Sequence, residues 1–174
     1  FRAEIPMLLI GGQSSQAQHK MGSLQDLPHV DMMQPITKFA STVMSTERCA
    51  DMVSMAFRET RNGSYGPSFL EIPRDILDTS IPMSKAVLPQ AGKYSASPKT
   101  LADPIDIQKA ADMISKAERP CVLLGQQVWT CQSTDEAIDF VRKLNIPAYL
   151  NGAARGTLPP GDQHHFHRTR RNAF

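Results

Sequence analysis

The sequence is short of aromatic residues and of paired cysteines. Aromatic side chains make up 6% of the 174 residues, and the nine methionines imply that aliphatic and thioether groups fill much of the core. The three cysteines, Cys49, Cys121 and Cys131, show no Cys-x-x-Cys spacing and leave one unpaired in any disulfide scheme. This usage argues against a secreted disulfide scaffold and favours an intracellular, cytoplasmic setting.

A strong charge of one sign and a long apolar run are also missing. The formal net charge is +2, which gives no electrostatic reason to expect a nucleic acid or an anionic membrane as partner. No apolar run approaches the length of a membrane span. No Walker A loop, GxGxxG fingerprint or Gly-x-Ser-x-Gly elbow is present, so no nucleophile triad can be assigned. The expected partner is a small-molecule substrate.

The chain is organised around residues 66–76. Gly66-Pro67 breaks the preceding element, and Phe69, Leu70 and Ile72 predict a short buried parallel strand. Pro73 has no amide hydrogen for a ladder, so the strand should end at or just before it.

The preceding residues predict one α/β unit. Pro6–Ile10 reads as a buried strand ending at Gly11-Gly12, which puts Gln13, Ser14 and Ser15 in a loop at a ligand crevice or in an ordinary polar loop. Residues 30–33 could form a strand or a loop. A helix should follow Thr46 as N-cap and end at Asn62-Gly63.

A Pro-containing linker over residues 79–103 separates a second unit. Asp103 and Pro104 predict the start of a helix with an apolar face of Ile107, Ala110, Ala111 and Ile114. Strands are expected at 121–124 and 147–150, with a capping box at 133–136 opening the helix between them. No third strand is expected in this half. The predicted fold class is therefore α/β, with two partial doubly wound parallel-sheet units.

Two clusters near the end carry weak functional signals. His164, His165 and His167 lie close together, but no carboxylate or cysteine joins them with ligand spacing, so no metal site is predicted. Arg168, Arg170 and Arg171 could bind a phosphate group or could form a solvated basic loop, and composition does not decide between them.

Four segments in order resemble thiamine-diphosphate enzymes of the acetolactate synthase, 2-hydroxyacyl-CoA lyase and oxalyl-CoA decarboxylase family. They are Pro-Met-Leu-Leu-Ile-Gly-Gly-Gln at 6–13, Gly-Ser-Leu-Gln-Asp with Ile-Thr-Lys at 22–26 and 36–38, Phe-Leu-Glu-Ile-Pro-Arg-Asp at 69–75, and Ala-Glu-Arg-Pro-Cys-Val-Leu-Leu-Gly at 117–125. Residues 1–78 then resemble the C-terminal part of a pyrimidine-binding-type domain. Residues 104–174 resemble the N-terminal part of the central domain, which binds FAD or an ADP-containing cofactor or serves only structurally.

The resemblance implies roles for individual residues. Gln13, Gln25 and Lys38 would line the substrate channel, with Lys38 favouring a carboxylate or a CoA phosphate, while Leu24 replaces a channel Phe. Cofactor binding in the central domain would use Gly125, Gln126, Asn151, Gly152 and Arg171.

The resemblance also implies what the parent enzyme does. It would be a magnesium- and thiamine-diphosphate-dependent transferase or lyase acting on 2-oxo acids or 2-hydroxyacyl-CoA thioesters, and a homodimer or homotetramer. The family's activating glutamate and its metal motif match no segment of this chain, which opens without a methionine. We therefore expect no catalytic residue here and no activity of these 174 residues alone. The alternative is a non-catalytic nucleotide-binding or scaffold module using Gly125, Asn151 and Arg171.

Overall fold

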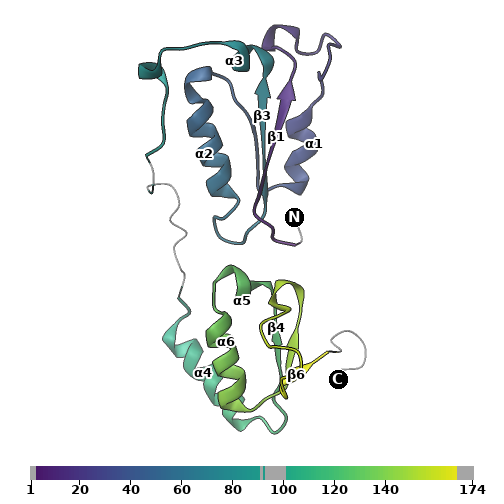
Figure 1. The fold of residues 1–174 in the computed structure, drawn as a ribbon, viewed down its shortest axis with the longest axis vertical. Coiled ribbons are helices and arrows are strands. Elements are labelled where there is room, and N and C mark those ends of the chain that lie inside the picture. Colours follow the sequence, from purple (N-terminus) through teal and green to yellow (C-terminus); the bar gives the residue numbers. More distant parts are fainter. Residues whose placement is uncertain (1–2, 91, 93–100, 168–174) are drawn as a thin grey trace. The chain divides into compact units, whose positions relative to one another are not determined.

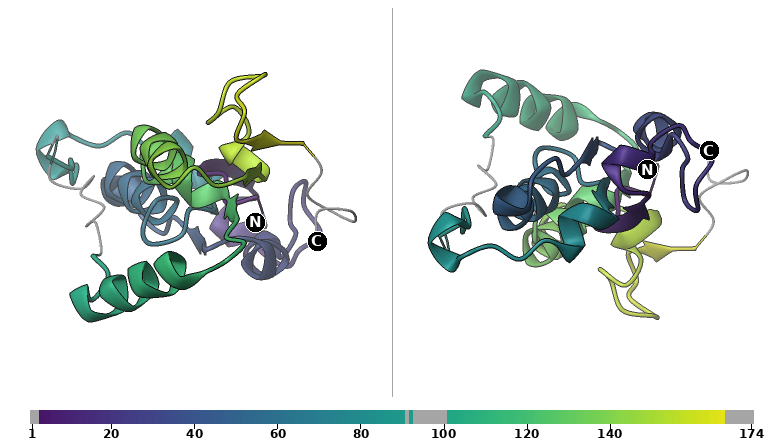
Figure 2. Two further views of the ribbon diagram at one scale, coloured as in Figure 1. Left: turned by 90° about the horizontal axis from the view of Figure 1, so that it is seen from below. Right: turned by 90° about the horizontal axis from the view of Figure 1, so that it is seen from above.

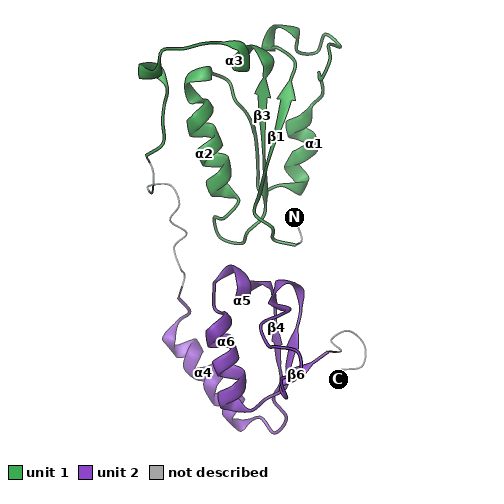
Figure 3. Ribbon diagram, viewed as in Figure 1, with its two compact units in different colours: residues 1–98 green, residues 99–174 purple. Residues whose placement is uncertain are grey.

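A computed structural model describes residues 3–90, 92 and 101–167, and the chain divides into two compact units, residues 1–98 and 99–174 (Figure 3). Each unit holds one three-stranded parallel sheet accompanied by helices, which confirms the predicted α/β class. Arg171 and its neighbours 168–170 lie outside the described residues. In the part of the chain that is described, no helix is long and apolar enough to cross a membrane.

The sheet of unit 1 is built on the segment that the sequence analysis singled out. Its strands are β1 (Met7–Gln13), β2 (Phe39–Thr42) and β3 (Pro67–Pro73), in the order β1-β3-β2. Every residue of β3 is buried, as expected for a central parallel strand that is covered on both faces. The prediction of a buried strand ending at Pro73 is confirmed.

One strand prediction in unit 1 needs correction, and one strand was missed. β1 does not stop at Gly11-Gly12: it continues to Gln13, with Gly11 paired to Glu71 and Gln13 paired to Pro73. A Cβ atom on Gly11 would lie 3.0 Å from the Phe69 ring, so glycine allows the strand to pass here. β2 was not predicted, because its sequence Phe-Ala-Ser-Thr contains no apolar run and it is half-buried throughout.

The helices of unit 1 lie on both faces of the sheet (Figure 1). Leu70 and Ile72 of β3 pack in the core with Met52 and Ala56 of α2, whereas Phe69 and Glu71 point to the other face, where they meet His29 of α1. The helices are α1 (His29–Met33), α2 (Cys49–Glu59) and α3 (Arg74–Asp78), with short 3₁₀ turns at Gln16–Gln18, Gln34–Ile36, Thr46–Arg48 and Met83–Lys85.

Local predictions in unit 1 were partly wrong. Residues 30–33 belong to helix α1 and form neither a strand nor a loop. Thr46 does not cap a helix with its side chain: its hydroxyl donates to the Ile76 carbonyl oxygen at 2.9 Å, which ties the start of the α2 region to α3. α2 ends at Glu59, before Asn62-Gly63, and Gly63 takes a positive φ of 66° in the turn that follows.

Unit 2 contains one strand more than expected. β4 (Val122–Leu124), β5 (Ala148–Leu150) and β6 (His165–Phe166) pair in that order and in parallel. The expectation of two strands failed because β6 is a two-residue strand inside a histidine-rich segment with no apolar run. The buried core of this unit comprises Leu124, Val141, Ala148, Leu150, Ala154 and Leu158.

The helices of unit 2 are α4 (Pro104–Lys116), α5 (Gln126–Thr130) and α6 (Thr134–Leu144), followed by a 3₁₀ turn at Gly152–Ala154. The Asp103 carboxylate accepts a hydrogen bond from the Ile105 amide at 2.8 Å, which confirms the predicted N-cap. Ser133 starts α6 but makes no side-chain cap, so the predicted capping box is wrong. Only Ile114 of the predicted apolar face of α4 is half-buried, and Figure 2 shows α4 standing clear of the sheet of its own unit.

Candidate functional site

The carboxyl ends of the three parallel strands in unit 1 meet at a hollow of about 550 Å³. Gln13 ends β1, Thr42 ends β2, and Glu71 lies two residues before the end of β3. Ligands of open α/β sheets bind at this edge, since the loops that follow the strands gather there. The remaining lining residues come from the loop after β1 and from α1: His19, Lys20, Gly22, Asp26, Leu27, Pro28, His29, Val30 and Asp31.

A buried carboxylate forms the floor of this hollow. Glu71 is 5% exposed and accepts hydrogen bonds on both of its oxygens. The Thr42 hydroxyl donates to Oε1 at 2.8 Å, and the Gln13 amide donates to Oε2 at 3.0 Å. His29 Nδ1 lies 2.9 Å from the same Oε2. One glutamate therefore ties together the ends of all three strands and the helix that covers them.

Two of the three predicted channel residues lie at or beside the hollow. Gln13 is 5% exposed and is held by Glu71 and by the Leu27 carbonyl oxygen, to which it donates at 2.8 Å. Gln25 lies over β1: a Cβ atom built on Gly12 would be 3.4 Å from Gln25 Oε1. The loop after β1 thus returns to the strand and carries Gln25 back to the end where Gln13 sits.

Lys38 lies at the other end of the same sheet. Its backbone amide donates to the Pro67 carbonyl oxygen at 2.8 Å, at the start of β3, and its Nζ donates to the Asn62 carbonyl oxygen. The amino ends of parallel strands lie together, one strand length away from their carboxyl ends. The structure therefore does not bring Lys38 to the hollow that contains Gln13.

Sequence reasoning missed both members of the His29–Glu71 pair. Glu71 carried a signal, because a charged residue inside the buried run Phe-Leu-Glu-Ile-Pro is unusual unless it has partners. His29 carried none: it is 42 positions from Glu71, and only the packing of α1 brings the two side chains together.

The predicted cofactor residues of unit 2 also gather at the ends of strands. Gly125 and Gln126 follow β4, while Asn151 and Gly152 follow β5. Gln126 Oε1 accepts a hydrogen bond from the Ala153 amide at 3.0 Å, and Asn151 Oδ1 accepts one from the Gly152 amide at 3.0 Å. Gly152 has a positive φ of 58°, and a Cβ atom on it would lie 3.1 Å from Gln126 Oε1, so glycine fits this turn.

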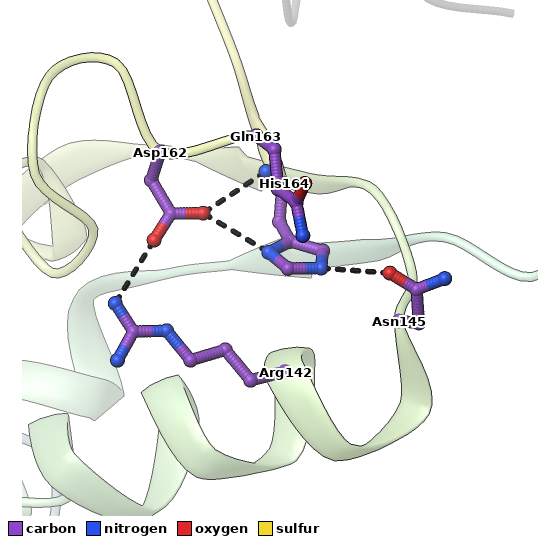
Figure 4. Close-up of a pocket in the computed structure, with 5 residues that line it drawn as sticks. All are labelled: Arg142, Asn145, Asp162, Gln163 and His164. Atoms are coloured by element: carbon purple, nitrogen blue, oxygen red, sulfur yellow. Dashed lines mark hydrogen bonds and ion pairs between the residues drawn. The ribbon is translucent and has the colours of Figure 1, made fainter.

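A second polar pocket, of about 390 Å³, lies between the end of α6 and the residues before β6 (Figure 4). Asp162 accepts from Arg142 Nη2 at 3.0 Å and from the His164 amide at 3.0 Å, and the two ring nitrogens of His164 lie 3.0 Å from Asp162 Oδ1 and 2.9 Å from Asn145 Oδ1. His164 is 8% exposed. Among the described residues no group of three or more histidine, cysteine or acidic side chains is placed to hold a metal. This network fastens the β6 segment to α6.

Asp162 gives a prediction about acid stability. The hydrogen bond from the His164 amide, followed by that from Arg142, lowers the pKa of this carboxyl from 3.8 to about 2. Because the folded state favours the ionised form, the resulting stability is complete above pH 3.8 and is lost as the pH falls toward 2. The free energy of unfolding of Asp162→Asn should therefore decrease less than that of the wild type as the pH falls from 3.8 to about 2. Urea denaturation at several pH values would measure both. The control is Asp139→Asn, an exposed position on α6, and equal slopes for wild type and Asp162→Asn would contradict the prediction.

Comparisons with known proteins find similar sequences both for part of unit 2 and for nearly the whole chain. Residues 107–172 match the family model described as thiamine pyrophosphate enzyme, central domain. The chain is 30% identical, over 97% of its length, to a protein named probable acetolactate synthase from Mycobacterium bovis, of which it covers 30%. It is 28% identical, over 95% of its length, to 2-hydroxyacyl-CoA lyase 2 from Homo sapiens, of which it covers 31%.

The similarity extends to an archaeal protein. A protein named probable acetolactate synthase large subunit from Methanocaldococcus jannaschii is 26% identical over 88% of this chain, which covers 26% of that protein. The chain therefore spans about a third or less of the length of the curated relatives it matches. Together these matches confirm the resemblance to thiamine-diphosphate enzymes of the acetolactate synthase and 2-hydroxyacyl-CoA lyase group.

Proposed function

We propose that these 174 residues act as part of a larger thiamine-diphosphate-dependent carboligase or lyase that uses 2-oxo acids or 2-hydroxyacyl-CoA thioesters. The observation that carries the proposal is the similarity along nearly the whole chain to proteins named acetolactate synthase and 2-hydroxyacyl-CoA lyase 2. In this proposal residues 1–78 are the end of a pyrimidine-binding-type domain, 79–103 a linker, and 104–174 the start of the central domain. The full-length enzyme would be a homodimer or homotetramer.

The described residues do not by themselves fit the whole cofactor. They include no group of three histidine, cysteine or acidic side chains placed for the magnesium ion that accompanies the diphosphate. Glu71 is the buried carboxylate of the hollow, and both of its oxygens already accept hydrogen bonds from Thr42, Gln13 and His29. When bound, thiamine diphosphate supplies a nucleophilic carbon and an electron sink for breaking or forming a carbon–carbon bond. The residues of this chain would line the substrate-binding site and orient the substrate.

Within this proposal the hollow of unit 1 receives the substrate. Gln13 and Gln25 would wall it, with Gln13 held rigid by its bonds to Glu71 and Leu27. Lys38 could contribute only where the substrate channel extends to the amino ends of the strands. A substrate carboxylate or CoA phosphate reaching that end would meet the Lys38 ammonium group.

The proposal predicts cofactor-dependent turnover by the full-length polypeptide. Protein from its source should have an intact mass of roughly three times 19.2 kDa, as the relatives' lengths imply, and should convert a 2-oxo acid or a 2-hydroxyacyl-CoA thioester only with thiamine diphosphate and magnesium. Gln25→Ala should raise KM by about two- to tenfold, the effect of losing one hydrogen bond. Lys38→Ala should leave KM within about twofold if the hollow alone binds the substrate. A mass near 19.2 kDa, or turnover without the cofactor, would contradict the proposal.

A second candidate function is favoured by the ends of β4 and β5 in unit 2. Gly125, Gln126, Asn151 and Gly152 lie together at the edge of the sheet where nucleotides bind in doubly wound folds. Unit 2 could therefore hold FAD or an ADP-containing cofactor, with or without catalysis elsewhere. Saturable binding of ADP or FAD by the full-length protein in the absence of thiamine diphosphate, measured by calorimetry, would support this role.

A further inference from the structure

The orientation of the Gln13 amide fixes the hydrogen bonds around the buried carboxylate. The Ser14 backbone amide lies 2.8 Å from Gln13 Oε1, and a backbone amide can only donate, so this atom is the amide oxygen. Gln13 Nε2 is therefore the NH₂ group. Its two hydrogens point to the Leu27 carbonyl oxygen at 2.8 Å and to Glu71 Oε2 at 3.0 Å. Both donors of Gln13 are thus used by oxygens.

This orientation decides which nitrogen of His29 carries the proton. His29 Nδ1 lies 2.9 Å from Glu71 Oε2 and 3.5 Å from Gln13 Nε2. Gln13 has no hydrogen left for Nδ1, and a carboxylate oxygen only accepts, so Nδ1 must donate to Glu71. In a neutral imidazole with the hydrogen on Nδ1, the lone pair lies on Nε2. His29 is therefore held with a basic nitrogen on the side away from Glu71.

The ring that carries this nitrogen lines the hollow. The His29 side chain is 22% exposed and lines the hollow, whereas the Glu71 side chain behind it is 7% exposed. The hydrogen bonds found among residues 3–90, 92 and 101–167 include none to His29 Nε2. The T-shaped contact with the Phe69 ring, at 6.5 Å between centroids, restrains the imidazole further.

We propose that His29 is the group that exchanges a proton with the substrate's hydroxyl oxygen in this hollow. The inference rests on the proposed function, in the case where the substrate in the hollow is a 2-hydroxyacyl-CoA thioester. In the step, the substrate O–H bond breaks, a bond forms between that hydrogen and His29 Nε2, and the electron pair remains on the substrate oxygen. The reverse step returns the proton to oxygen, so no oxidant or other reactant is needed.

Glu71 is the positioning residue of the pair. It keeps the proton on His29 Nδ1, and its negative charge stabilises the imidazolium that forms when Nε2 takes a second proton. The Thr42 hydroxyl and the Gln13 amide hold the carboxylate in place from the ends of β2 and β1. A histidine oriented by a buried, hydrogen-bonded carboxylate is one of the arrangements that carry out general acid–base catalysis at oxygen.

Turnover of the full-length enzyme tests the chemical part of the inference. His29→Ala should lower kcat by about a hundredfold to ten-thousandfold with thiamine-diphosphate affinity unchanged, and added imidazole should restore about tenfold of the loss by filling the vacated space. A purely structural histidine would not be rescued in this way. His167→Ala, an exposed histidine of unit 2, is the matched control and should keep wild-type kcat with or without imidazole. A loss that imidazole does not restore would overturn the assignment.

The tautomer is a readout that needs no turnover. In full-length protein labelled with ¹⁵N-histidine, and assigned by the signal missing from His29→Ala, His29 should show a protonated Nδ1 and an unprotonated Nε2. The opposite tautomer would overturn the inference even in an active enzyme. Wild-type protein that never turns over with thiamine diphosphate would instead overturn the proposed function, and the inference with it. The two failures are therefore distinguishable.

Discussion

Replacing Leu70 with alanine is expected to lower the free energy of unfolding of unit 1 by about 2 to 5 kcal/mol. Leu70 lies in the middle of β3 and is 0% exposed. It packs in one core cluster with Val43, Met52 and Ala56. Alanine would leave a cavity between the central strand and α2 that neither element can close without disturbing the strand pairs on both sides.

Urea denaturation of wild type and variant would measure the loss. Leu77→Ala is the matched control, since Leu77 has the same side chain but is 61% exposed on α3, and its cost should stay within about 0.5 kcal/mol. Hydrogen exchange would locate the effect in β1, β2 and β3. A Leu70→Ala variant as stable as the Leu77→Ala control would show that β3 is not the element on which unit 1 depends.

The same strand shows how far the sequence predicts this fold. β3 was predictable because a short apolar run between Gly66-Pro67 and Pro73 indicates a buried strand bounded by chain-breaking residues. β2 (Phe-Ala-Ser-Thr) and β6 (His-Phe) were not, because neither contains an apolar run. They form strands because their backbone groups pair with those of an adjacent strand. β2 pairs with β3, and β6 pairs with β5.

The candidate site was predictable only where it follows from a strand end. Gln13 was predicted to lie in a loop just past the first strand, and it is in fact the last residue of β1. The loop from 14 to 28 has no periodicity, so its return to β1 and to His29 could not be anticipated. The channel role of Lys38 rests on the resemblance alone and stays a prediction, since Lys38 lies at the amino end of β2 and not beside Gln13.

Glu71→Ala is expected to cost about 3 to 5 kcal/mol in the free energy of unfolding of unit 1, although it removes no apolar contact. The cost arises from the groups left behind. The buried Gln13 amide, together with the partly buried Thr42 hydroxyl and His29 Nδ1, would lose its acceptor. Each unpaired buried donor costs about 1 to 3 kcal/mol.

Glu71→Gln separates hydrogen bonding from charge in this cluster. Its amide oxygen can still accept from Gln13 and His29, and its NH₂ group can donate to the Thr42 hydroxyl, which rotates to accept. We therefore expect Glu71→Gln to lose at most about 1 to 2 kcal/mol. Glu118→Ala, at an exposed loop position, is the control for removing a glutamate charge and should be nearly neutral.

The comparison is decided by urea denaturation of the three variants at neutral pH. If Glu71→Ala and Glu71→Gln were equally destabilised, the negative charge would matter and the hydrogen-bond count would not. If both were neutral, the ends of β1, β2 and β3 would be held by their backbone ladder alone. We expect the free energy of unfolding of Glu71→Ala to be far lower than that of Glu71→Gln. This result would show that the hydrogen bonds of one side chain, at the carboxyl edge of the sheet, hold the strand ends and His29 in place.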